Sequence, residues 1–333
     1  MGAIKLLVSG GCGFIGSQFV RTAIARDAAV VNLDKLTYSG NPENVADIAD
    51  DPRHTFVQGD ISDPELVGGL MDGVDAVVNF AAESHVDRSI LDPTGFITTD
   101  VLGTAVLMQA AQEHRISRFV QVSTDEVYGP VPEGEVDENA ALRPSSPYSA
   151  SKAGGDLQAL AFATTFGLDV VITRGANTYG PRQYPEKLIP LFVTNALDRL
   201  GLPIYGDGQQ VRNWIHVNDH CEGIWTALER GESGCVYNVA GDHYATNMEI
   251  TRLILEHTER GEDLIRHVSD RPGHDRRYGL DASRLRAVGW EPRIEFGQGL
   301  EDTVAWYREN RSWWEPIKSG EYRRYYERQY GAI

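Results

Sequence analysis

Short apolar runs recur along the first half of the chain, each about five residues long and each ending at a glycine or a polar residue. Leu, Val and Ile dominate them, as in strands that are buried on both faces of a parallel sheet. We therefore predict six strands, over residues 4–9, 29–33, 54–58, 76–80, 119–122 and 170–174.

The segments between these runs carry apolar residues at helical spacing. They predict helices over residues 14–26, 105–113 and 151–166. Strands that alternate with helices indicate an α/β protein with a doubly wound parallel sheet, the Rossmann arrangement.

The regular alternation fades after about Tyr179, where Gly and Pro interrupt the pattern. Helices are predicted over residues 188–200, 246–257 and 298–310, among short strands. We expect a Rossmann domain over residues 1–178 and a smaller mixed α/β domain over 179–333, with some later segments returning to the first sheet. The tail from Trp313 is rich in Tyr and Arg, which predicts a docking helix or a surface segment.

Composition narrows the partners and the compartment. The net charge of −17 over 333 residues argues against nucleic acid or an anionic membrane as the main partner. The three cysteines, Cys12, Cys221 and Cys235, form no Cys-x-x-Cys pair, so we expect neither disulfides nor a metal site, and a reducing cytoplasm. No run reaches the roughly 20 apolar residues of a membrane span.

A glycine-rich loop separates the first predicted strand from the first helix. Gly10, Gly13 and Gly16 permit a tight turn and close approach of the backbone to a pyrophosphate, which the helix N-terminus then attracts. Asp34 ends the second strand, where its carboxylate can bind both ribose hydroxyls and would repel a 2′-phosphate. The cofactor predicted here is NAD. Asp60, after the third strand, is assigned either to the adenine edge or to a simple turn.

Two carboxylates, Asp125 and Glu126, follow the fifth strand directly. Neighbouring side chains on a strand point to opposite faces, so the pair can serve one site only if the backbone leaves strand geometry there. Tyr148 and Lys152 stand four residues apart, on one face of a helix. An ammonium beside a phenol lowers the pKa of the phenol from about 10 toward neutrality, so Tyr148 can act as a base toward an alcohol.

These features resemble the extended short-chain dehydrogenase/reductase family, in the loop from Gly10 to Gly16 and in Tyr148 and Lys152. Within that family, residues 81–89, 123–129 and 177–190 are similar to the dTDP-glucose 4,6-dehydratases, and the similarity extends over essentially the whole chain. The stretch Thr124-Asp125-Glu126 is its most specific part, because epimerases and decarboxylases of the same fold generally lack an acidic pair there.

The resemblance implies a redox-neutral dehydration of a sugar nucleotide, with dTDP-glucose as the expected substrate. Tyr148 takes the proton of the 4-hydroxyl while C4 is oxidised, and Thr124 bonds the 4-oxygen. Glu126 then removes the C5 proton, Asp125 protonates the departing C6 hydroxyl, and C6 is reduced. This scheme needs Asp125 protonated and Glu126 ionised, as two close carboxyls in a partly buried site allow.

The resemblance also assigns further contacts. Those to the cofactor are Gly10, Gly13, Phe14, Ile15, Gly16, Asp34, Lys35, Thr37, Asp60, Ile61, Ala81, Ala82, Ser84, Thr99, Tyr148 and Lys152. Those to the substrate are Ser84, Thr124, Asn177, Lys187, Leu188, Pro203, Tyr205, Arg212, Asn247, Arg271, His274 and Tyr278. Asp100, where asparagine is usual, and Cys12 in the glycine loop depart from the family pattern.

Several alternatives stay open at this stage. The same dehydration could act on UDP-glucose or another nucleotide hexose, because thymine and uracil differ by one methyl group, worth roughly 1–3 kcal/mol in a pocket. A sugar-nucleotide 4-epimerase would need Tyr148 and Lys152 but not the acidic pair. A non-catalytic, NAD-sensing regulatory protein would need neither. The resemblance further implies a homodimer that pairs through the Tyr148 helix and the helix over 105–113.

Overall fold

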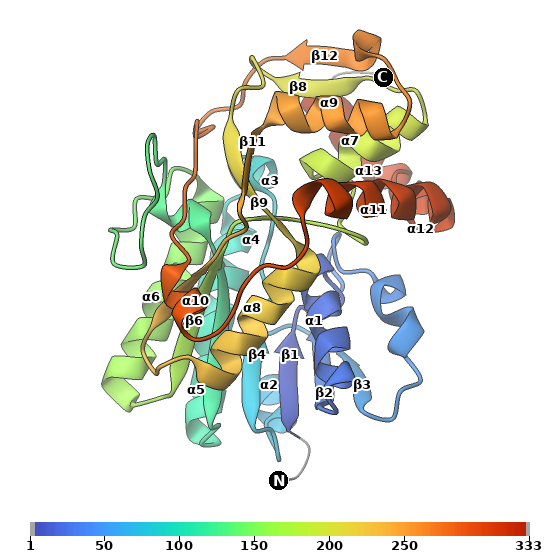
Figure 1. Cartoon of the computed structure of the whole chain (residues 1–333). Coiled ribbons are helices and arrows are strands. Elements are labelled where there is room, and N and C mark those ends of the chain that lie inside the picture. Colours follow the sequence, from blue (N-terminus) through green and yellow to red (C-terminus); the bar gives the residue numbers. More distant parts are fainter. Residues whose placement is uncertain (1–3, 331–333) are drawn as a thin grey trace.

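Seven parallel strands form the central sheet in the computed structural model, which describes residues 4–330 (Figure 1). Their order is β10-β6-β5-β4-β1-β2-β3. From β3 to β6 this is the Rossmann order, so the predicted fold class is confirmed. The strands are β1 (Lys5–Ser9), β2 (Ala29–Asp34), β3 (His54–Gln58), β4 (Ala76–Asn79), β5 (Arg118–Thr124), β6 (Val170–Gly175) and β10 (Val236–Val239).

Helices cover both faces of this sheet (Figure 1). On one face lie α1 (Phe14–Ala25) and α8 (Val217–Arg230), and on the other α2 (Pro64–Leu70), α5 (Thr104–Glu113) and α6 (Pro147–Phe166). The run of β1 is apolar throughout because it is buried on both faces of the sheet. Leu6 and Val8 lie in the cluster beneath α1 and α8, and Leu7 lies in the cluster on the other face, beneath α2, α5 and α6. Each such fully buried side chain contributes about 1.5–3 kcal/mol to the free energy of unfolding.

The start of α6 and the segment before α5 differ from the prediction. Helix α6 begins at Pro147, one turn before the predicted residue 151, because Ser146 and Ser149 form a reciprocal capping box and proline suits the first helical position. A π-helix over Ile97–Gly103, which the sequence pattern did not predict, leads into α5. Shorter turns are η1 (Pro42–Ile48), α3 (Val86–Leu91), α4 (Thr94–Phe96), η3 (Asp125–Tyr128) and η4 (Glu262–Leu264).

A smaller region lies over the carboxyl edge of the large sheet (Figure 1). It holds a mixed three-stranded sheet of β7 (Asn177–Tyr179), β9 (Val211–His216) and β11 (His243–Thr246), and a parallel pair of β8 (Leu202–Tyr205) and β12 (Ile265–Val268). Its helices are α7 (Leu188–Leu197), α9 (Asn247–His257) and α11 (Phe296–Glu309). The chain returns to the large sheet through α8, β10 and α10 (Ser283–Ala287).

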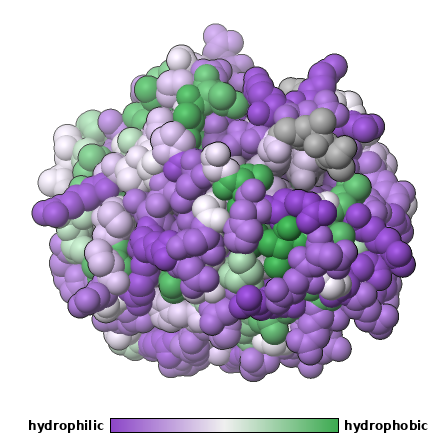
Figure 2. Space-filling view, turned by 90° about the horizontal axis from the view of Figure 1, so that it is seen from above, coloured by the Kyte–Doolittle hydropathy of each residue, from purple (hydrophilic) through white to green (hydrophobic). Residues whose placement is uncertain are grey.

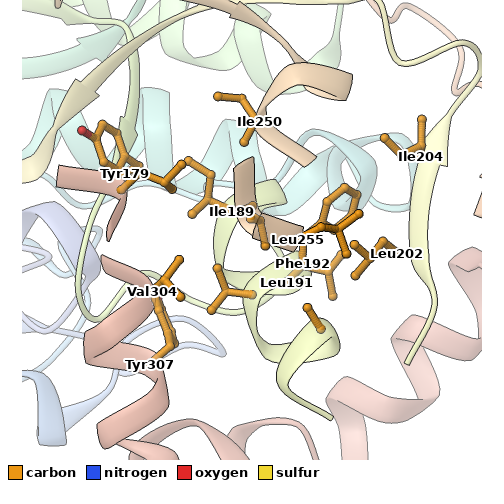
Figure 3. Packing of buried hydrophobic residues seen from close by; sticks show 14 of the residues in the cluster. Tyr179, Ile189, Leu191, Phe192, Leu202, Ile204, Ile250, Leu255, Val304 and Tyr307 are labelled. Carbon is orange, nitrogen blue, oxygen red and sulfur yellow. The ribbon is translucent and has the colours of Figure 1, made fainter. Parts of the chain in front are cut away.

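The smaller region has its own apolar core (Figure 3). Phe192 of α7 packs with Leu255 of α9 and Leu202 of β8, and Val304 and Tyr307 of α11 complete the cluster. Helix α7 ends at Leu197 rather than at the predicted residue 200. This core fixes α7 and β8 over the sheet edge, where both carry predicted substrate residues.

The C-terminal tail docks onto the smaller region as two helices, α12 (Arg311–Ile317) and α13 (Gly320–Tyr330). Trp314, Tyr322 and Tyr326 are buried in the same core, so the predicted docking helix is confirmed. The molecular surface at the top of Figure 1 is mainly hydrophilic, with small separate hydrophobic patches (Figure 2). Within residues 4–330, no helix combines the length and apolarity that a membrane crossing requires.

Candidate active site

Two adjoining cavities lie between the carboxyl ends of the large sheet and the smaller region. The first, of about 280 Å³, follows the sheet edge, and the second, of about 140 Å³, enters the smaller region. Glu126, Asn177 and Lys187 line both cavities and mark their junction.

Each residue predicted for the site lies on one of these cavities. The first cavity holds all the predicted cofactor and catalytic residues, namely Gly10, Gly13, Phe14, Ile15, Gly16, Asp34, Lys35, Thr37, Asp60, Ile61, Ala81, Ala82, Ser84, Thr99, Thr124, Asp125, Glu126, Tyr148 and Lys152. The second holds Leu188, Pro203, Tyr205, Arg212, Asn247, Arg271, His274 and Tyr278. Segments from both ends of the sequence thus meet at one sheet edge.

The glycine loop between β1 and α1 has the shape that a pyrophosphate needs. Gly10 has φ of +73°, and a Cβ on it would lie 2.7 Å from the Ala81 nitrogen. A Cβ on Gly16 would lie 2.2 Å from the Gly10 carbonyl oxygen. Helix α1 begins at Phe14 with no side chain capping its first amides, so these N–H groups and the helix dipole can bind an anion. The loop therefore fits the pyrophosphate of NAD.

The carboxylate of Asp34 is fixed by backbone amides at the end of β2. Its Oδ2 accepts a hydrogen bond from the Cys12 amide and its Oδ1 one from the Leu36 amide, both at 2.8 Å. A carboxylate has about four acceptor sites, so each oxygen can accept a further bond from a ribose hydroxyl. Burial raises the pKa of Cys12 to about 12, so this departure from the family pattern leaves a neutral thiol in the loop.

The acidic pair lies where β5 changes into the η3 turn. Strand β5 ends at Thr124, and its Oγ1 accepts a hydrogen bond from the Glu126 amide at 3.3 Å and donates one to Asp125 Oδ1 at 3.1 Å. The backbone thus leaves strand geometry at the position where a shared site requires it. Both carboxyl groups line the first cavity together with Tyr148 and Lys152.

The two carboxyls of this pair have different electrostatic surroundings. Burial raises the pKa of Asp125 to about 7, and the charge of Glu126 adds to the shift. Burial raises the pKa of Glu126 as well, but three nearby cations oppose this shift, those of Arg271, Lys187 and Arg212. The carboxyls titrate as a pair, and these surroundings favour the shared proton on Asp125.

The prediction that Lys152 lowers the pKa of Tyr148 is wrong for this chain. Burial raises the pKa of Tyr148 well above its usual value, and the charges of Glu126 and Asp100 add to the effect. Lys152 Nζ donates a hydrogen bond to the carbonyl oxygen of Val122 at 2.8 Å. Burial of the phenol, with the two carboxylates adding to it, therefore outweighs the effect of one ammonium, and a cationic ring bound beside Tyr148 would act in the opposite direction.

Asp100 lies in the π-helix and is almost fully buried. Its Oδ2 accepts a hydrogen bond from Ser151 Oγ at 2.5 Å, and its Oδ1 accepts one from the Glu83 amide at 3.1 Å. Burial raises the pKa of Asp100 to about 6, so the group is mainly a carboxylate at neutral pH. These hydrogen bonds accommodate an aspartate where asparagine is usual. The negative charge of Asp100 adds to the rise in the pKa of Tyr148.

Three cations line the second cavity and are held mainly by backbone atoms. Lys187 Nζ donates to the Ser84 carbonyl oxygen, and Arg212 donates to the Asp275 carbonyl oxygen at 2.9 Å. Neither cation forms an ion pair through these bonds, so both can still bind the diphosphate of a sugar nucleotide. Arg271 instead forms an ion pair of 2.8 Å with a carboxylate, that of Asp87.

Sequence reasoning did not single out three polar residues of the site. Asp87 and Glu186 lie within stretches that carried the family resemblance, so closer attention to those stretches could have found them. His220 of α8 lines the first cavity and had no such signal. Its Nδ1 lies 2.7 Å from Thr178 Oγ1, burial lowers its pKa to about 4, and its Nε2 has no hydrogen-bond partner in the part of the chain that is described.

The fold and this arrangement of groups define an extended short-chain dehydrogenase/reductase that acts on a nucleotide sugar. A family model described as GDP-mannose 4,6 dehydratase matches residues 7–303. The chain is 52% identical to the dTDP-glucose 4,6-dehydratase of Streptomyces niveus, covering 95% of this chain and 96% of that protein. It is 42% identical to dTDP-glucose 4,6-dehydratase 1 of Escherichia coli, covering 98% of this chain and 99% of that protein. The chain belongs to the dTDP-glucose 4,6-dehydratase family.

Solved structures separate the dehydratases from the epimerases of the same fold. DesIV, the dTDP-glucose 4,6-dehydratase of Streptomyces venezuelae solved with NAD bound, gives a TM-score of 0.93 at 52% identity, covering 95% of this chain and all of that one. The UDP-glucose 4-epimerase of Thermus thermophilus, in complex with NAD, gives a TM-score of 0.86 at 32% identity, covering 92% of this chain and all of that one. The fold is shared by both groups, and the sequence is nearer to the dehydratase.

Proposed function

We propose that this chain is an NAD-dependent hydro-lyase that converts dTDP-glucose to dTDP-4-keto-6-deoxyglucose. One observation carries the proposal: Asp125 and Glu126 line the same cavity as Tyr148 and Lys152. An epimerase needs only the second pair, because it makes no change at C5 or C6. The dehydratase relatives support dTDP-glucose as the substrate.

The chain's own groups divide the proton transfers between them. With a cationic cofactor ring beside it to lower the pKa of its phenol, Tyr148 would take the proton of the 4-hydroxyl, and Lys152, held by the Val122 carbonyl oxygen, lies one helical turn further along. Once C4 is a ketone, the C5 proton is acidic enough for Glu126 to remove. Asp125 gives its proton to the C6 hydroxyl, which departs as water. Once C6 has been reduced, a proton returns to C5, and Glu126 is placed to supply it. The raised pKa of Asp125 keeps a proton on it near neutral pH, which supports this division of roles.

The glycine loop and Asp34 fit NAD, and Ile61 and Thr99 would complete its binding site. When bound, NAD supplies the oxidation of C4 and the matching reduction of C6, so the net reaction is redox-neutral. We propose that the part containing the large sheet binds the cofactor and that the smaller region binds the sugar nucleotide. The cytoplasmic setting expected from the three cysteines, which are free thiols, stays a prediction.

The test is incubation of the purified protein with dTDP-glucose, followed by treatment with base and measurement of the 4-ketone chromophore. We expect the chromophore to accumulate without net build-up of reduced cofactor, and more slowly or not at all with UDP-glucose. Conversion to a hexose isomer without a ketone would favour the epimerase, and no conversion of any nucleotide hexose would refute an enzyme.

We propose in addition that the protein is a homodimer. Large apolar side chains are exposed on three helical segments that pack together: Ile90 and Leu91 of α3, Ile97 and Leu102 of the π-helix, and Leu157 and Phe166 of α6. Each is between 41% and 58% exposed. Exposed apolar groups of this kind favour burial against a second copy. Of the two expected pairing helices, α6 carries two of these residues, Leu157 and Phe166, and α5 carries none but follows the π-helix directly.

Two charges placed on this face should separate the dimer. We expect the double variant Leu102→Glu, Leu157→Glu to run as a monomer in light scattering, where the parent runs as a dimer. Phe56→Glu, at a 40% exposed site on edge strand β3, is the matched control and should remain dimeric. A monomeric parent, or a double variant of unchanged mass, would refute the proposed interface.

A further inference from the structure

The C-terminal helix α13 is anchored firmly onto the smaller region. Tyr322 donates a hydrogen bond to the Pro185 carbonyl oxygen at 2.7 Å, and Asn195 Nδ2 donates one to the Tyr326 hydroxyl at 3.2 Å. Tyr325 is buried as well. Since these three rings hold the helix, its last turn has a defined position at the rim of the second cavity.

The last two described residues of α13 contact a predicted substrate residue, Tyr205. Gln329 Nε2 donates a hydrogen bond to the Tyr205 hydroxyl at 2.7 Å and lies 3.4 Å from Asp87 Oδ2. The Tyr205 hydroxyl donates in turn to the same Asp87 oxygen at 2.9 Å. The Tyr330 ring lies 5.7 Å from the Tyr205 ring, tilted by 43°, and lines the second cavity.

The two parts of the second cavity suit different parts of a sugar nucleotide. The sugar carbons that react must lie at the junction, because Glu126 is there. Tyr205, His274 and Tyr330 line the second cavity and not the first. Cations bind the diphosphate, whereas the flat face of a base binds to aromatic rings. The aromatic part of the cavity therefore suits the nucleobase.

We propose that Tyr330 is a binding residue for the pyrimidine base of the substrate, and that Gln329 is a positioning residue that acts through Tyr205. This inference rests on the proposed function and adds to it a role for the Tyr- and Arg-rich tail. Gln329 and Asp87 occupy the Tyr205 hydroxyl from two sides, which fixes the orientation of the Tyr205 ring. The base then lies against two tyrosine rings, one from β8 and one from α13.

Steady-state kinetics of the full-length holoenzyme test this role. We expect Tyr330→Ala to raise the KM for dTDP-glucose about tenfold, as for the loss of one stacking contact, with kcat within about twofold of the parent. Binding of dTDP, measured by calorimetry, should weaken by the same factor. Tyr330→Phe should restore both values, and Gln329→Ala should raise KM by a smaller factor.

The NAD content and melting temperature of each variant distinguish binding from a purely structural role. The NAD content should be unchanged in Tyr330→Ala, because α13 does not line the first cavity, and the melting temperature should fall only slightly, since Tyr330 packs at the edge of the core. Arg323→Ala, at an exposed site on the same helix, is the matched control and should behave as the parent. Unchanged KM and dTDP affinity in Tyr330→Ala, or a rise accompanied by loss of NAD, would overturn the inference. A parent that binds dTDP without converting dTDP-glucose would instead refute the proposed function.

Discussion

Replacing Glu126 by Gln should reduce kcat for dTDP-glucose by about 10²- to 10⁴-fold, the range for loss of a general base. The variant lacks the base that removes the C5 proton, yet it keeps Tyr148 and Lys152. We expect it to oxidise C4 and then to stop, so that reduced nicotinamide accumulates on the enzyme. Exchange of the C5 proton with deuterated water, followed by NMR, should fall by a similar factor.

Glu229→Gln, at an exposed position on α8, is the control for the loss of one carboxylate and should retain parental activity. Normal incorporation of solvent deuterium at C5 by Glu126→Gln would assign the base to another group. A variant that failed to reduce its cofactor at all would place Glu126 in the first step instead.

Replacing Asp125 by Asn should lower activity and at the same time raise stability at alkaline pH. The variant cannot protonate the departing C6 hydroxyl, so kcat should fall by about 10²- to 10⁴-fold. In the folded chain the pKa of Asp125 is about 7, compared with 3.8 ordinarily. Ionisation of this buried group therefore opposes folding, and Oδ2 has no hydrogen-bond partner within residues 4–330.

The sign of the pH effect follows from proton binding. The folded chain holds the Asp125 proton more tightly than the unfolded chain, so the contribution of Asp125 to the unfolding free energy falls as pH rises between about 4 and 7 and is then level. Asn does not titrate. The variant should therefore gain about 2–3 kcal/mol over the parent between pH 5 and pH 8, measured by urea unfolding. The exposed Asp72→Asn variant should show no such gain. If the difference in unfolding free energy between variant and parent did not change with pH, ionisation of Asp125 would not destabilise the folded chain.

The sequence was sufficient for six of the seven strands of the large sheet, β1 to β6, because each of these is a continuous local signal, whereas β10 was not predicted. Leu6, Leu7 and Val8 are buried on alternating faces between two helical layers, and such burial leaves an unbroken apolar run. The glycine loop and Asp34 were recognisable for the same reason, because spacing along the chain sets their geometry.

Features that depend on contacts between distant segments could not be predicted. The π-helix had no local signal. The pKa of Tyr148 was wrongly predicted from its neighbour Lys152, because burial of the ring raises it and the charges of Glu126 and Asp100, which lie on other elements, add to the shift. The contacts of Gln329 with Tyr205 and Asp87 span 124 and 242 residues, so the role proposed for the tail needed the folded chain.

The mass of the product formed in deuterated water tests the central claim most directly. The purified protein is incubated with dTDP-glucose in deuterated water, and the sugar nucleotide is analysed by mass spectrometry and NMR. Dehydration through Glu126 and Asp125 predicts a product that has lost one water and carries one deuterium at C5. A product of unchanged mass, or a dehydrated product with no deuterium at C5, would contradict the account.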